Sequence, residues 1–282
     1  NESNQLISEH DLAIFFKNAD AAIVGTELIT EKVLNHAKRL KIISKYGVGL
    51  DNIDLESLKN KNIKLGWTGG LNRRSVSELT LCFILGLFRN VFKSASKLKQ
   101  IQWEKEGGQQ LTGKTIGIIG CGHIGSDLIK LLVPFKCNLL VNDIINKSEF
   151  CRSYGAVQVD LKTIISQSDL ISLHVPLTTL TKQMVDDDFL VKMKPSAYLI
   201  NTSRGGVVSQ NALKKALKQH LIAGAALDVF SDEPPEDEEL LTLPNLVGTP
   251  HIGGNALEAV EAMGHSAIAH LIEFFENPTT SA

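Results

Sequence analysis

KTIGIIGCGHIG, residues 114–125, is the stretch that decides the fold, because an apolar strand-like segment runs directly into the pattern G-x-G-x-x-G. A helix-like segment, residues 124–135, follows it. In such a unit the first glycine makes a tight turn, the second lets a pyrophosphate approach the backbone, and the third lets helix and strand pack closely. These positions are Gly120, Gly122 and Gly125. The glycine pattern is weak by itself, but the strand and helix around it predict a dinucleotide site at the helix N-terminus.

An acidic residue after the next predicted strand indicates which dinucleotide is bound. Residues 138–142 read as a strand and lead into Asp143, which lies eighteen residues after Gly125. A carboxylate there binds the adenosine ribose hydroxyls and repels a 2′-phosphate, so we predict NAD rather than NADP. The alternative is a glycine-rich turn with an incidental loop aspartate. We also expect His123 and Ile124 at the cofactor, and the sequence leaves open whether His123 faces the pyrophosphate or solvent.

The composition is that of an ordinary soluble globular protein. The chain has 282 residues, of which 43% are hydrophobic and 21% charged, and this length fits two domains. A formal net charge of −2 argues against a surface for nucleic acid or anionic membranes. No apolar run reaches the roughly 20 residues of a membrane span, and the first residues do not read as a signal segment. We therefore expect a cytoplasmic protein that binds neither nucleic acid nor membranes.

The four cysteines point to the same compartment. Cys82, Cys121, Cys137 and Cys151 form no C-x-x-C pair, so reduced and unpaired thiols are the simplest interpretation. No cluster of histidine and cysteine has the spacing of metal ligands, and we expect no metal site.

Short apolar runs alternate with amphipathic stretches along the chain, which predicts βαβ units and parallel sheets. The runs that read as strands are 21–24, 42–44, 63–65, 115–119, 139–142, 170–173, 197–201, 223–227 and 246–248. Helices are expected at 30–40, 55–60, 77–90, 124–135, 210–219 and 255–277. We predict an α/β fold with two doubly wound parallel-sheet domains: a Rossmann nucleotide domain (79–254) inserted into a flavodoxin-like substrate domain (1–78 and 255–282).

Three expectations concern the edges of these domains. The polar stretch 93–113 is interpreted as a hinge. The helix 255–277 is expected to return and pack on the first domain. Because a sheet domain normally has a strand before residue 21, we also expect an N-terminal strand upstream of the given residues.

Three polar segments in the last third of the chain carry residue types used in catalysis. They are residues 201–206, 228–235 and 249–254, and each follows a predicted strand. Open α/β sheets bind their ligands at this end of the strands. Arg204, in the first segment, can grip a carboxylate with two hydrogen bonds and polarise a neighbouring carbonyl. For a single arginine on a Gly-Gly turn, a surface role is the usual alternative.

His251 and Glu233 supply the chemistry that Arg204 lacks. His251 lies in a Thr-Pro-His turn and can give a proton to a forming alkoxide or take it back. Glu233, in an Asp-Glu-Pro-Pro segment, can bond the far ring nitrogen, fix the tautomer and favour the imidazolium. A packing histidine and a solvated acidic run are the alternatives for each residue alone. Three such residues at successive strand ends, after a dinucleotide loop, predict a site for a 2-keto acid.

Two further strand ends are expected to face the cofactor. Asp228 follows the strand 223–227 and is assigned to the nicotinamide carboxamide, with a loop-turn role as the rival interpretation. His174 and Pro176 follow the strand 170–173 and are expected to line the cofactor cleft. For His174 itself we expect a structural rather than a catalytic role.

These segments together resemble the D-isomer-specific 2-hydroxyacid dehydrogenase family over nearly the whole chain. The matching segments are 120–125, 174–178, 201–206, 227–230, 233–234 and 250–254. The resemblance implies Arg204 as substrate anchor, His251 as the acid–base group and Glu233 as its partner. It also implies that Thr202, together with Asp228, contacts the nicotinamide end of the cofactor.

The resemblance gives a meaning to the glycine-rich loop at residues 45–54, which otherwise reads as a plain strand-to-helix turn. In such a loop, backbone amides hold the substrate carboxylate, and here Gly47, Val48 and Gly49 would supply them. The implied substrate-binding set is Lys45, Tyr46, Gly47, Val48, Gly49, Asn72 and Arg204.

Within the family the chain looks most like phosphoglycerate dehydrogenases and hydroxypyruvate or glyoxylate reductases. Lys45, Arg73 and Arg74 favour a substrate with an extra anionic group, with solvated surface as the alternative interpretation. The segment 67–72 departs from the family's commoner Thr-Pro-Gly-x-Asn, which leaves the substrate open. We predict an NAD-dependent oxidoreductase that interconverts a small D-2-hydroxy acid and its 2-keto acid. Candidates are 3-phosphoglycerate, hydroxypyruvate and glyoxylate.

Other functions stay open on the sequence alone. Some relatives are NADH-sensing co-repressors that bind peptides, and the near-neutral charge counts against this class. Formate or phosphite oxidation is a third option. The resemblance also implies a homodimer, formed through the helix 77–90 and the polar stretch after it.

Overall fold

The structure is a computed structural model that describes residues 7–276, and the chain divides into two compact units. Unit 1 comprises Asn1–Asn72 and Asn255–Ala282, and unit 2 comprises Arg73–Gly254. Unit 2 is therefore inserted into unit 1, as the predicted fold class requires. The predicted domain boundary at residue 78 lies inside unit 2, because the helix that crosses it, α4, is continuous over Arg73–Phe88.

The sheet of unit 2 has seven parallel strands in the order β10-β9-β8-β7-β4-β5-β6. The strands are β4 (Thr115–Ile119), β5 (Asn138–Asn142), β6 (Ala156–Gln158), β7 (Leu170–Leu173), β8 (Tyr198–Asn201), β9 (Gly224–Leu227) and β10 (Leu246–Gly248). The strand order reverses at β4, with β5 and β6 on one side and β7 to β10 on the other. This is the doubly wound arrangement, whose ligands bind at the carboxyl ends of the strands beside the switch point.

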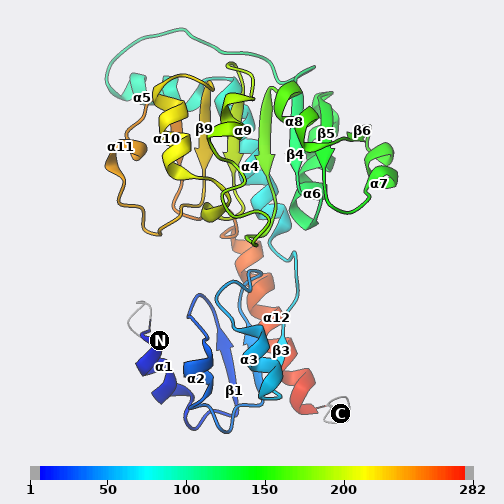
Figure 1. Ribbon diagram of the computed structural model, residues 1–282, viewed down its shortest axis with the longest axis vertical. Coiled ribbons are helices and arrows are strands. Elements are labelled where there is room, and N and C mark those ends of the chain that lie inside the picture. Colours follow the sequence, from blue (N-terminus) through cyan, green and yellow to red (C-terminus); the bar gives the residue numbers. More distant parts are fainter. Residues whose placement is uncertain (1–6, 277–282) are drawn as a thin grey trace. The chain divides into compact units, whose positions relative to one another are not determined.

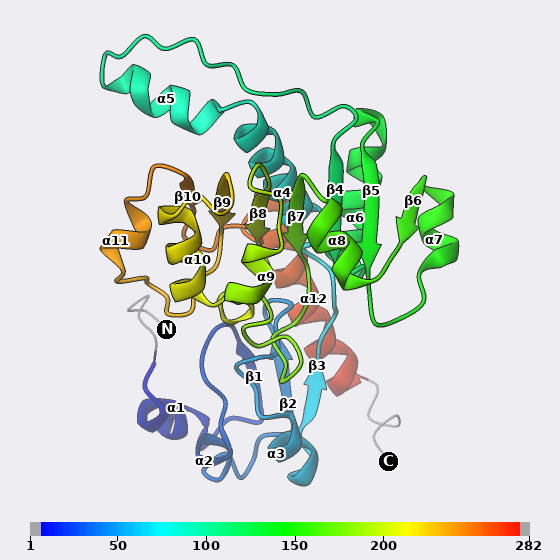
Figure 2. The same ribbon diagram turned by 45° about the horizontal axis from the view of Figure 1, so that its top comes forward.

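Helices cover both faces of this sheet (Figure 1). Helices α4 and α6 (His123–Leu132) lie on one face, and α8 (Leu161–Gln167), α9 (Asp187–Val191) and α10 (Gln210–Lys218) on the other (Figure 2). Strand β4 serves both faces because successive side chains of a strand point to opposite sides. Ile116 and Ile118 join the core with α4 and α6, whereas Ile119 joins the core with α8 to α10. The remaining elements of this unit are α5 (Val91–Lys99), η1 (Val133–Phe135), α7 (Ser148–Ser153), η2 (Gly205–Val207) and α11 (Glu238–Leu241).

Unit 1 contains a smaller sheet of three parallel strands in the order β1-β2-β3. Its elements are α1 (Glu9–Phe16), β1 (Ala21–Val24), α2 (Glu31–Leu34), β2 (Ile42–Lys45), α3 (Leu55–Asn60), β3 (Lys64–Gly66) and α12 (Leu257–Glu276). Helix α12 packs on all three strands. The other face carries a core to which α1, α2 and α3 each contribute buried apolar side chains.

The packing of α12 on the sheet explains why one strand ends in glycine. A Cβ on Gly66 would lie 2.6 Å from the Cβ of His270, so the two backbones could not approach as they do. Ser44 on β2 donates a hydrogen bond to the Ala267 carbonyl over 2.7 Å. The last helix thus packs on the first domain, as the sequence predicts, and its predicted end at residue 277 lies outside the described residues.

Two predictions about individual elements are wrong, and one strand is not predicted. The stretch 93–113 is not a hinge, because residues 91–99 form α5 inside unit 2 and the unit boundary precedes α4. The helix predicted at 30–40 ends at Leu34, after which the backbone makes turns closed by hydrogen bonds between residues i and i+3. Strand β6 is not among the predicted strands, because three residues with one buried side chain give no periodic pattern.

Candidate active site

The glycine-rich loop between β4 and α6 has the conformation that its glycines allow. Gly120 has a φ of 94°, and a Cβ there would lie 2.3 Å from the His174 carbonyl oxygen. A Cβ on Gly125 would lie 2.0 Å from the Gly120 carbonyl oxygen, whereas one on Gly122 would meet nothing within 4 Å. Gly120 and Gly125 are therefore required by the loop itself, and Gly122 faces open space. Helix α6 begins at His123 without a side-chain cap, and uncapped amides at a helix start are a binding site for anions.

Asp143, directly after β5, is hydrogen-bonded to this loop. Its Oδ2 accepts from the Cys121 amide over 2.7 Å, and its Oδ1 accepts from the Ile145 amide over 2.8 Å. Two backbone bonds thus hold a partly exposed carboxylate beside the phosphate loop. Burial raises the pKa of the Cys121 thiol to about 11, so this thiol is neutral at physiological pH.

His174 follows β7, and its imidazole turns into the protein. Its Nε2 lies 2.9 Å from Ser172 Oγ, and its Nδ1 is buried with no hydrogen-bond partner among residues 7–276. Burial lowers the pKa of His174 to about 3. An imidazole that stays neutral near pH 7 does not exchange protons there, so the structure gives His174 a structural role. Pro176, two residues later, is exposed, and its carbonyl accepts a hydrogen bond from the Thr181 hydroxyl over 2.5 Å.

Arg204 lies in the loop after β8, and hydrogen bonds hold that loop in shape. Asn201 Nδ2 donates to the Arg204 carbonyl over 2.9 Å, and Asn201 Oδ1 accepts from both the amide and the hydroxyl of Ser203. Arg204 Nη1 donates to the Ser203 carbonyl over 2.7 Å. A Cβ on the next residue, Gly205, would lie 1.9 Å from the carbonyl carbon of Phe230. The Arg204 loop therefore packs directly against the loop that follows β9.

Glu233 and His251 come from different loops and meet in the structure. Glu233 Oε2 is 2.7 Å from His251 Nδ1, and Glu233 Oε1 accepts from the Phe230 amide over 3.0 Å. The side chains of His251 and Glu233 are 49% and 37% exposed. A carboxylate only accepts hydrogen bonds, so Nδ1 carries the hydrogen and Nε2 is left for a reacting group. The pair can therefore exchange a proton at Nε2.

Asp228, only 1% exposed at the end of β9, fixes the turn that carries His251. Its Oδ1 accepts from the Thr249 hydroxyl (2.6 Å) and the Ile252 amide (2.8 Å), and its Oδ2 accepts from the Gly253 amide (2.8 Å). His251 has a φ of 54°, a left-handed conformation that is uncommon for a residue with a side chain. The structure thus gives Asp228 the loop-turn role, and its contact with a nicotinamide stays a prediction.

A continuous set of contacts links the three predicted catalytic loops. The Arg204 loop packs on Phe230, the Phe230 amide bonds Glu233, and Glu233 bonds His251. All three loops leave the carboxyl ends of neighbouring strands, β8, β9 and β10. The structure therefore brings the loops of the guanidinium, the carboxylate and the imidazole to one end of one sheet.

The remaining predicted residues belong to unit 1, where the loop after β2 presents a row of amides. Gly47 has a φ of 124°, and Trp67 Nε1 donates to the Val48 carbonyl over 3.1 Å, which holds the loop. Within the part of the chain that the structure describes, the amides of Gly47, Val48 and Gly49 donate no hydrogen bond. Neighbouring amides of this kind form a concave site for anions. Tyr46, at the start of the loop, is 37% exposed.

Lys45 is engaged inside unit 1. Only 6% of it is exposed, and its Nζ donates to the Gly25 carbonyl and, over 2.8 Å, to Asn52 Oδ1. Asn52 in turn donates to the carbonyls of Gly25 and Glu27. Asn72 ends the first segment of the unit, and its Oδ1 is buried without a partner among residues 7–276. The substrate contacts of Lys45 and Asn72 stay predictions.

Comparison with known proteins identifies the family. The family model described as D-isomer specific 2-hydroxyacid dehydrogenase, NAD binding domain, matches residues 81–253, which is more than half of the chain. The chain belongs to this family. The match lies in unit 2 and includes the phosphate loop, so the predicted family and the predicted cofactor, NAD, are confirmed.

Two relatives and one solved structure show how similar the chain is to members of this family. The glyoxylate reductase of Thermococcus litoralis is 40% identical and matches 92% of this chain and 81% of its own length. The D-3-phosphoglycerate dehydrogenase of Methanocaldococcus jannaschii is 38% identical over 92% of this chain, which spans only 50% of that relative. The D-lactate dehydrogenase of Aquifex aeolicus, solved with NAD and lactic acid, is 29% identical with a TM-score of 0.86, covering 96% of this chain and 86% of that one. The predicted oxidoreductase class and α/β fold are thereby confirmed.

The sequence does not reveal the polar contacts that α4 makes. The sequence suggests that Arg74 is a cation near the substrate, but its Nη2 pairs with Asp127 Oδ1 of α6 over 3.0 Å. Thr80 Oγ1 lies 3.0 Å from Thr202 Oγ1, and both residues are buried. The sequence feature that could have indicated these contacts is serine and threonine on the buried side of an apolar helix, where polar groups need a hydrogen-bond partner.

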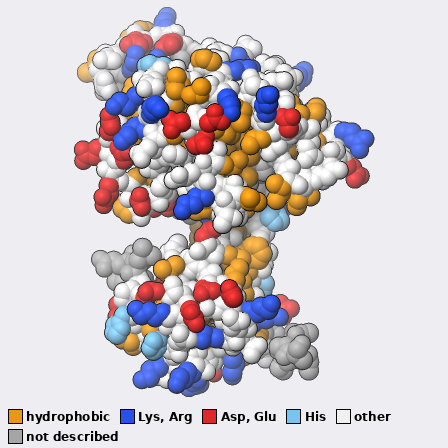
Figure 3. Space-filling view, in the orientation of Figure 1, with side chains coloured by type: hydrophobic (Ala, Val, Ile, Leu, Met, Phe, Trp, Pro, Cys, Tyr) orange, Lys and Arg blue, Asp and Glu red, His pale blue; other side chains and the backbone are white. Residues whose placement is uncertain are grey.

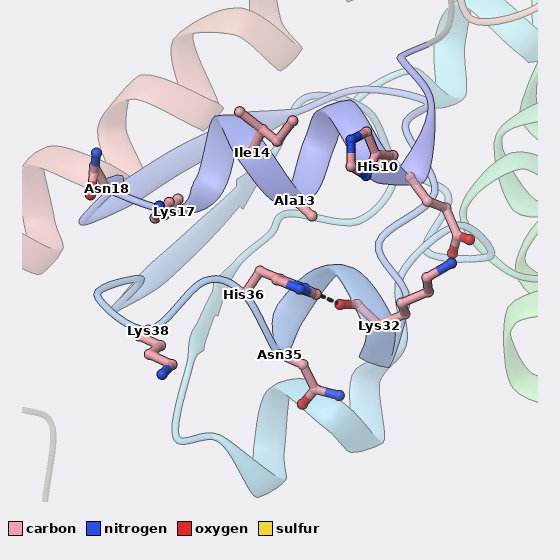
Figure 4. Close-up of a pocket in the computed structure, with 10 residues that line it drawn as sticks. His10, Ala13, Ile14, Lys17, Asn18, Lys32, Asn35, His36 and Lys38 are labelled. Atoms are coloured by element: carbon pink, nitrogen blue, oxygen red, sulfur yellow. Dashed lines mark hydrogen bonds between the residues drawn. The ribbon is translucent and has the colours of Figure 1, made fainter.

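A hollow of about 500 Å³ lies between α1 and α2 of unit 1 (Figure 4). His10, Lys17, Lys32 and His36 are among its lining residues, and His36 Nδ1 lies 3.0 Å from the Lys32 carbonyl oxygen. The lining includes none of the predicted site residues. This hollow is therefore not part of the candidate active site.

Charged side chains of both signs are mixed on the visible surface. Lysine, arginine, aspartate and glutamate side chains are interspersed on the face that Figure 3 shows, in both units. Within residues 7–276 no single helix is long and apolar enough to cross a membrane; by length and composition alone, α4 and α5 pass together, with a bend of 70° between them. Among the same residues, no group of three or more histidine, cysteine, aspartate or glutamate side chains could hold a metal ion.

Proposed function

We propose that the protein interconverts a small 2-keto acid and the corresponding D-2-hydroxy acid, with NADH or NAD as the hydride donor or acceptor. One observation carries the proposal: the 2.7 Å contact between Glu233 and His251 at the carboxyl end of a sheet whose switch point holds the phosphate loop. A carboxylate–imidazole pair in that place suits reversible proton transfer to an alcohol oxygen.

His251 is proposed as the acid–base residue. In the reductive direction its Nε2 donates a proton to the forming alkoxide, and in the oxidative direction it takes the proton from the hydroxyl. Glu233 holds the ring by Nδ1 and compensates the positive charge of the imidazole while it is protonated. The amides at the start of α6 would hold the pyrophosphate of NADH and Asp143 its ribose, and the bound cofactor would supply the hydride. We also propose that Thr202 and Asp228 contact the nicotinamide.

Arg204 is proposed as the substrate anchor. A planar guanidinium matches a carboxylate with two parallel hydrogen bonds, and the loop that carries Arg204 leaves the carboxyl end of β8, where this fold binds its ligands. We propose that the amides of Gly47, Val48 and Gly49 can hold a carboxylate, because they donate no hydrogen bond within the described residues.

We propose glyoxylate or hydroxypyruvate as the substrate, rather than a phosphorylated acid. In the sequence, the cations that favour a phosphate group are Lys45, Arg73 and Arg74. Lys45 is bonded to Gly25 and Asn52, Arg74 is paired with Asp127, and Arg73 also has a partner. The relatives include both a glyoxylate reductase and a phosphoglycerate dehydrogenase. Glyoxylate, hydroxypyruvate and 3-phosphohydroxypyruvate should therefore be compared in one assay. The co-repressor alternative gains no support from these relatives.

The test is NADH oxidation with glyoxylate, hydroxypyruvate and 3-phosphohydroxypyruvate, with NAD plus formate as a further arm. Arg204→Gln should raise KM for the best keto acid and lower kcat/KM on the order of a thousandfold, the scale of a lost charged contact in the transition state. Arg152→Gln, a matched change on the exposed helix α7, should leave kcat/KM unchanged. A wild-type protein that binds NADH but reduces none of the three acids contradicts the proposed function.

We also propose a cytoplasmic homodimer. The four cysteines are free thiols, in keeping with a reducing compartment. Helix α5 has no buried residue, and Val91, Leu98, Ile101 and Trp103 are between 52% and 94% exposed. Apolar side chains gathered on one segment mark a protein–protein contact. Size-exclusion chromatography with light scattering should give twice the monomer mass for the wild type and the monomer mass for Trp103→Glu.

A further inference from the structure

The first two turns of α4 carry three hydroxyl side chains, and each of them bonds to a different part of the site. We propose that Ser75, Ser77 and Thr80 are positioning residues, which set the His251 turn, the phosphate-binding helix and the Arg204 loop, respectively. The proposal rests on the function proposed above. None of the three touches substrate or cofactor in this scheme, because each acts through a backbone or side-chain group of a neighbouring loop.

Ser75 holds the end of the His251 turn. Its Oγ donates to the Gly253 carbonyl over 2.6 Å, while the Gly253 amide donates to Asp228 Oδ2 over 2.8 Å. The peptide groups of Gly253 are thus held from both sides, by α4 and by the buried aspartate. Ser75 lies three positions into unit 2 and Gly253 one position before its end. One hydrogen bond therefore joins the two places where the chain enters and leaves the unit.

Thr80 fixes the side chain of Thr202 and, through it, the Arg204 loop. Thr80 Oγ1 donates its only hydrogen to the Val76 carbonyl over 2.8 Å. In its 3.0 Å contact with Thr202, Thr80 must therefore accept, and Thr202 must donate. Both hydroxyls are buried, at 0% and 6% exposure, so no water replaces a lost partner without cost. Thr202 lies two residues before Arg204 in the same loop.

Ser77 bonds to the helix that carries the phosphate loop. Its Oγ donates to the Ile124 carbonyl over 3.2 Å, and Ser77 is fully buried. Ile124 lies between Gly122 and Gly125, in the first turn of α6. The pair Arg74–Asp127 joins the same two helices one turn further along. The orientation of the uncapped amides of α6 thus depends on α4.

A purely structural role and a positioning role predict different kinetics. If the hydroxyls only stabilise the fold, their removal lowers the Tm and leaves the kinetic constants unchanged at a temperature where all variants are folded. If they position separate loops, each removal changes a different constant. We expect Ser75→Ala to lower kcat, Ser77→Ala to raise KM for NADH, and Thr80→Val to raise KM for the keto acid. Each change should be about three- to tenfold, the equivalent of one buried hydrogen bond.

The experiment is steady-state kinetics on the full chain, with Tm by calorimetry and Kd for NADH by fluorescence titration. Ser166→Ala is the matched control, because its hydroxyl bonds a carbonyl of its own helix, α8, and no site loop. Thr80→Ser keeps the hydroxyl and should restore KM for the keto acid. The proposal would be overturned if kcat, both KM values and the Kd for NADH stayed close to those of Ser166→Ala. It would also be overturned if all three variants changed the same constant.

The outcome is separable from the proposed function. A wild type without reductase activity contradicts that function, and the Ser77→Ala arm is then decided by the Kd for NADH alone. An active wild type whose Ser75 and Thr80 variants lose stability but keep kcat and KM contradicts the positioning role. A Thr80→Ser variant as impaired as Thr80→Val likewise counts against it, because the hydroxyl would then not be the group that matters.

Discussion

Two histidines follow strands of the same sheet, and the structure gives them opposite properties. His174 follows β7, is bonded to Ser172, and is kept neutral by burial, which lowers its pKa to about 3. His251 follows β10, is 49% exposed, and is bonded through Nδ1 to Glu233. A strand end therefore does not assign a histidine its chemistry. The hydrogen-bond partner and the solvent exposure of the imidazole decide whether it can exchange a proton. Four variants test this difference between His174 and His251.

The largest expected effect is on proton transfer at His251. His251→Gln keeps much of the side-chain volume but removes the proton that Nε2 exchanges, and we expect kcat to fall on the order of a thousandfold. The Kd for NADH should stay within about twofold, since the phosphate loop is untouched. His36→Gln, at the hollow of unit 1, is the control and should keep its kcat. Near-normal turnover of the His251 variant would remove the proposed mechanism.

A smaller effect is expected from the partner of His251. Glu233→Gln can still occupy the site but carries no negative charge to compensate a protonated imidazole, so kcat should fall on the order of a hundredfold. Glu236→Gln removes a charge from the same acidic loop without touching His251 and should change kcat by less than about twofold. Equal kcat values for the two variants would show that loop charge, rather than the contact with Nδ1, matters.

The third effect concerns the turn on which His251 sits. Asp228→Asn places an amide group where Asp228 now accepts three hydrogen bonds from the Thr249–Gly253 segment. We expect a loss of stability of about 1.5–3 kcal/mol, the value of hydrogen bonds to a charged group, and a roughly tenfold lower kcat. Thermal unfolding and turnover measured on the same preparation check both. An Asp228 variant with wild-type stability would show that the turn holds its shape without the carboxylate.

The smallest effect on rate, and a distinct effect on stability, is expected for His174. Its folded pKa of about 3 lies below the ordinary value of 6.5, so between these pH values the unfolded chain binds a proton that the folded chain does not. The stability that comes from neutral His174 is therefore complete above pH 6.5 and is lost as the pH falls towards 3. His174→Gln should flatten the pH dependence of the Tm in this window, whereas His36→Gln should not. Parallel curves for the wild type and His174→Gln would show that His174 titrates normally.

The sequence predicts those parts of the fold that depend on local pattern. Strands β1, β4, β7 and β10 have the predicted bounds, because short apolar runs between turn residues define a buried parallel strand. The phosphate loop is predictable for a similar reason, since glycine is required where a Cβ would collide with backbone. Strand β6 is too short to show a periodic pattern, and α5 lies in a polar stretch and buries none of its residues, so the sequence predicts neither element.

The candidate site is predictable only in part. The proximity of the loops that carry Arg204, Glu233 and His251 could be predicted, because the carboxyl ends of parallel strands meet at one edge of a sheet. The burial of Lys45 and the pairing of Arg74 with Asp127 could not be predicted, since both depend on how separate elements pack. The same holds for the three hydroxyls of α4. Residues whose role depends on a distant partner carry no signature of their own.

The fit of Gly205 against Phe230 has a consequence for protein engineering. Any side chain at position 205 would occupy the space of the Phe230 backbone, which would push apart the loops that carry Arg204 and Glu233. Libraries aimed at new keto acids should therefore randomise positions around Arg204 and keep residue 205 as glycine. Changing it would move the anchor and the acid–base pair in one mutational step, so that altered selectivity and lost turnover could not be selected separately.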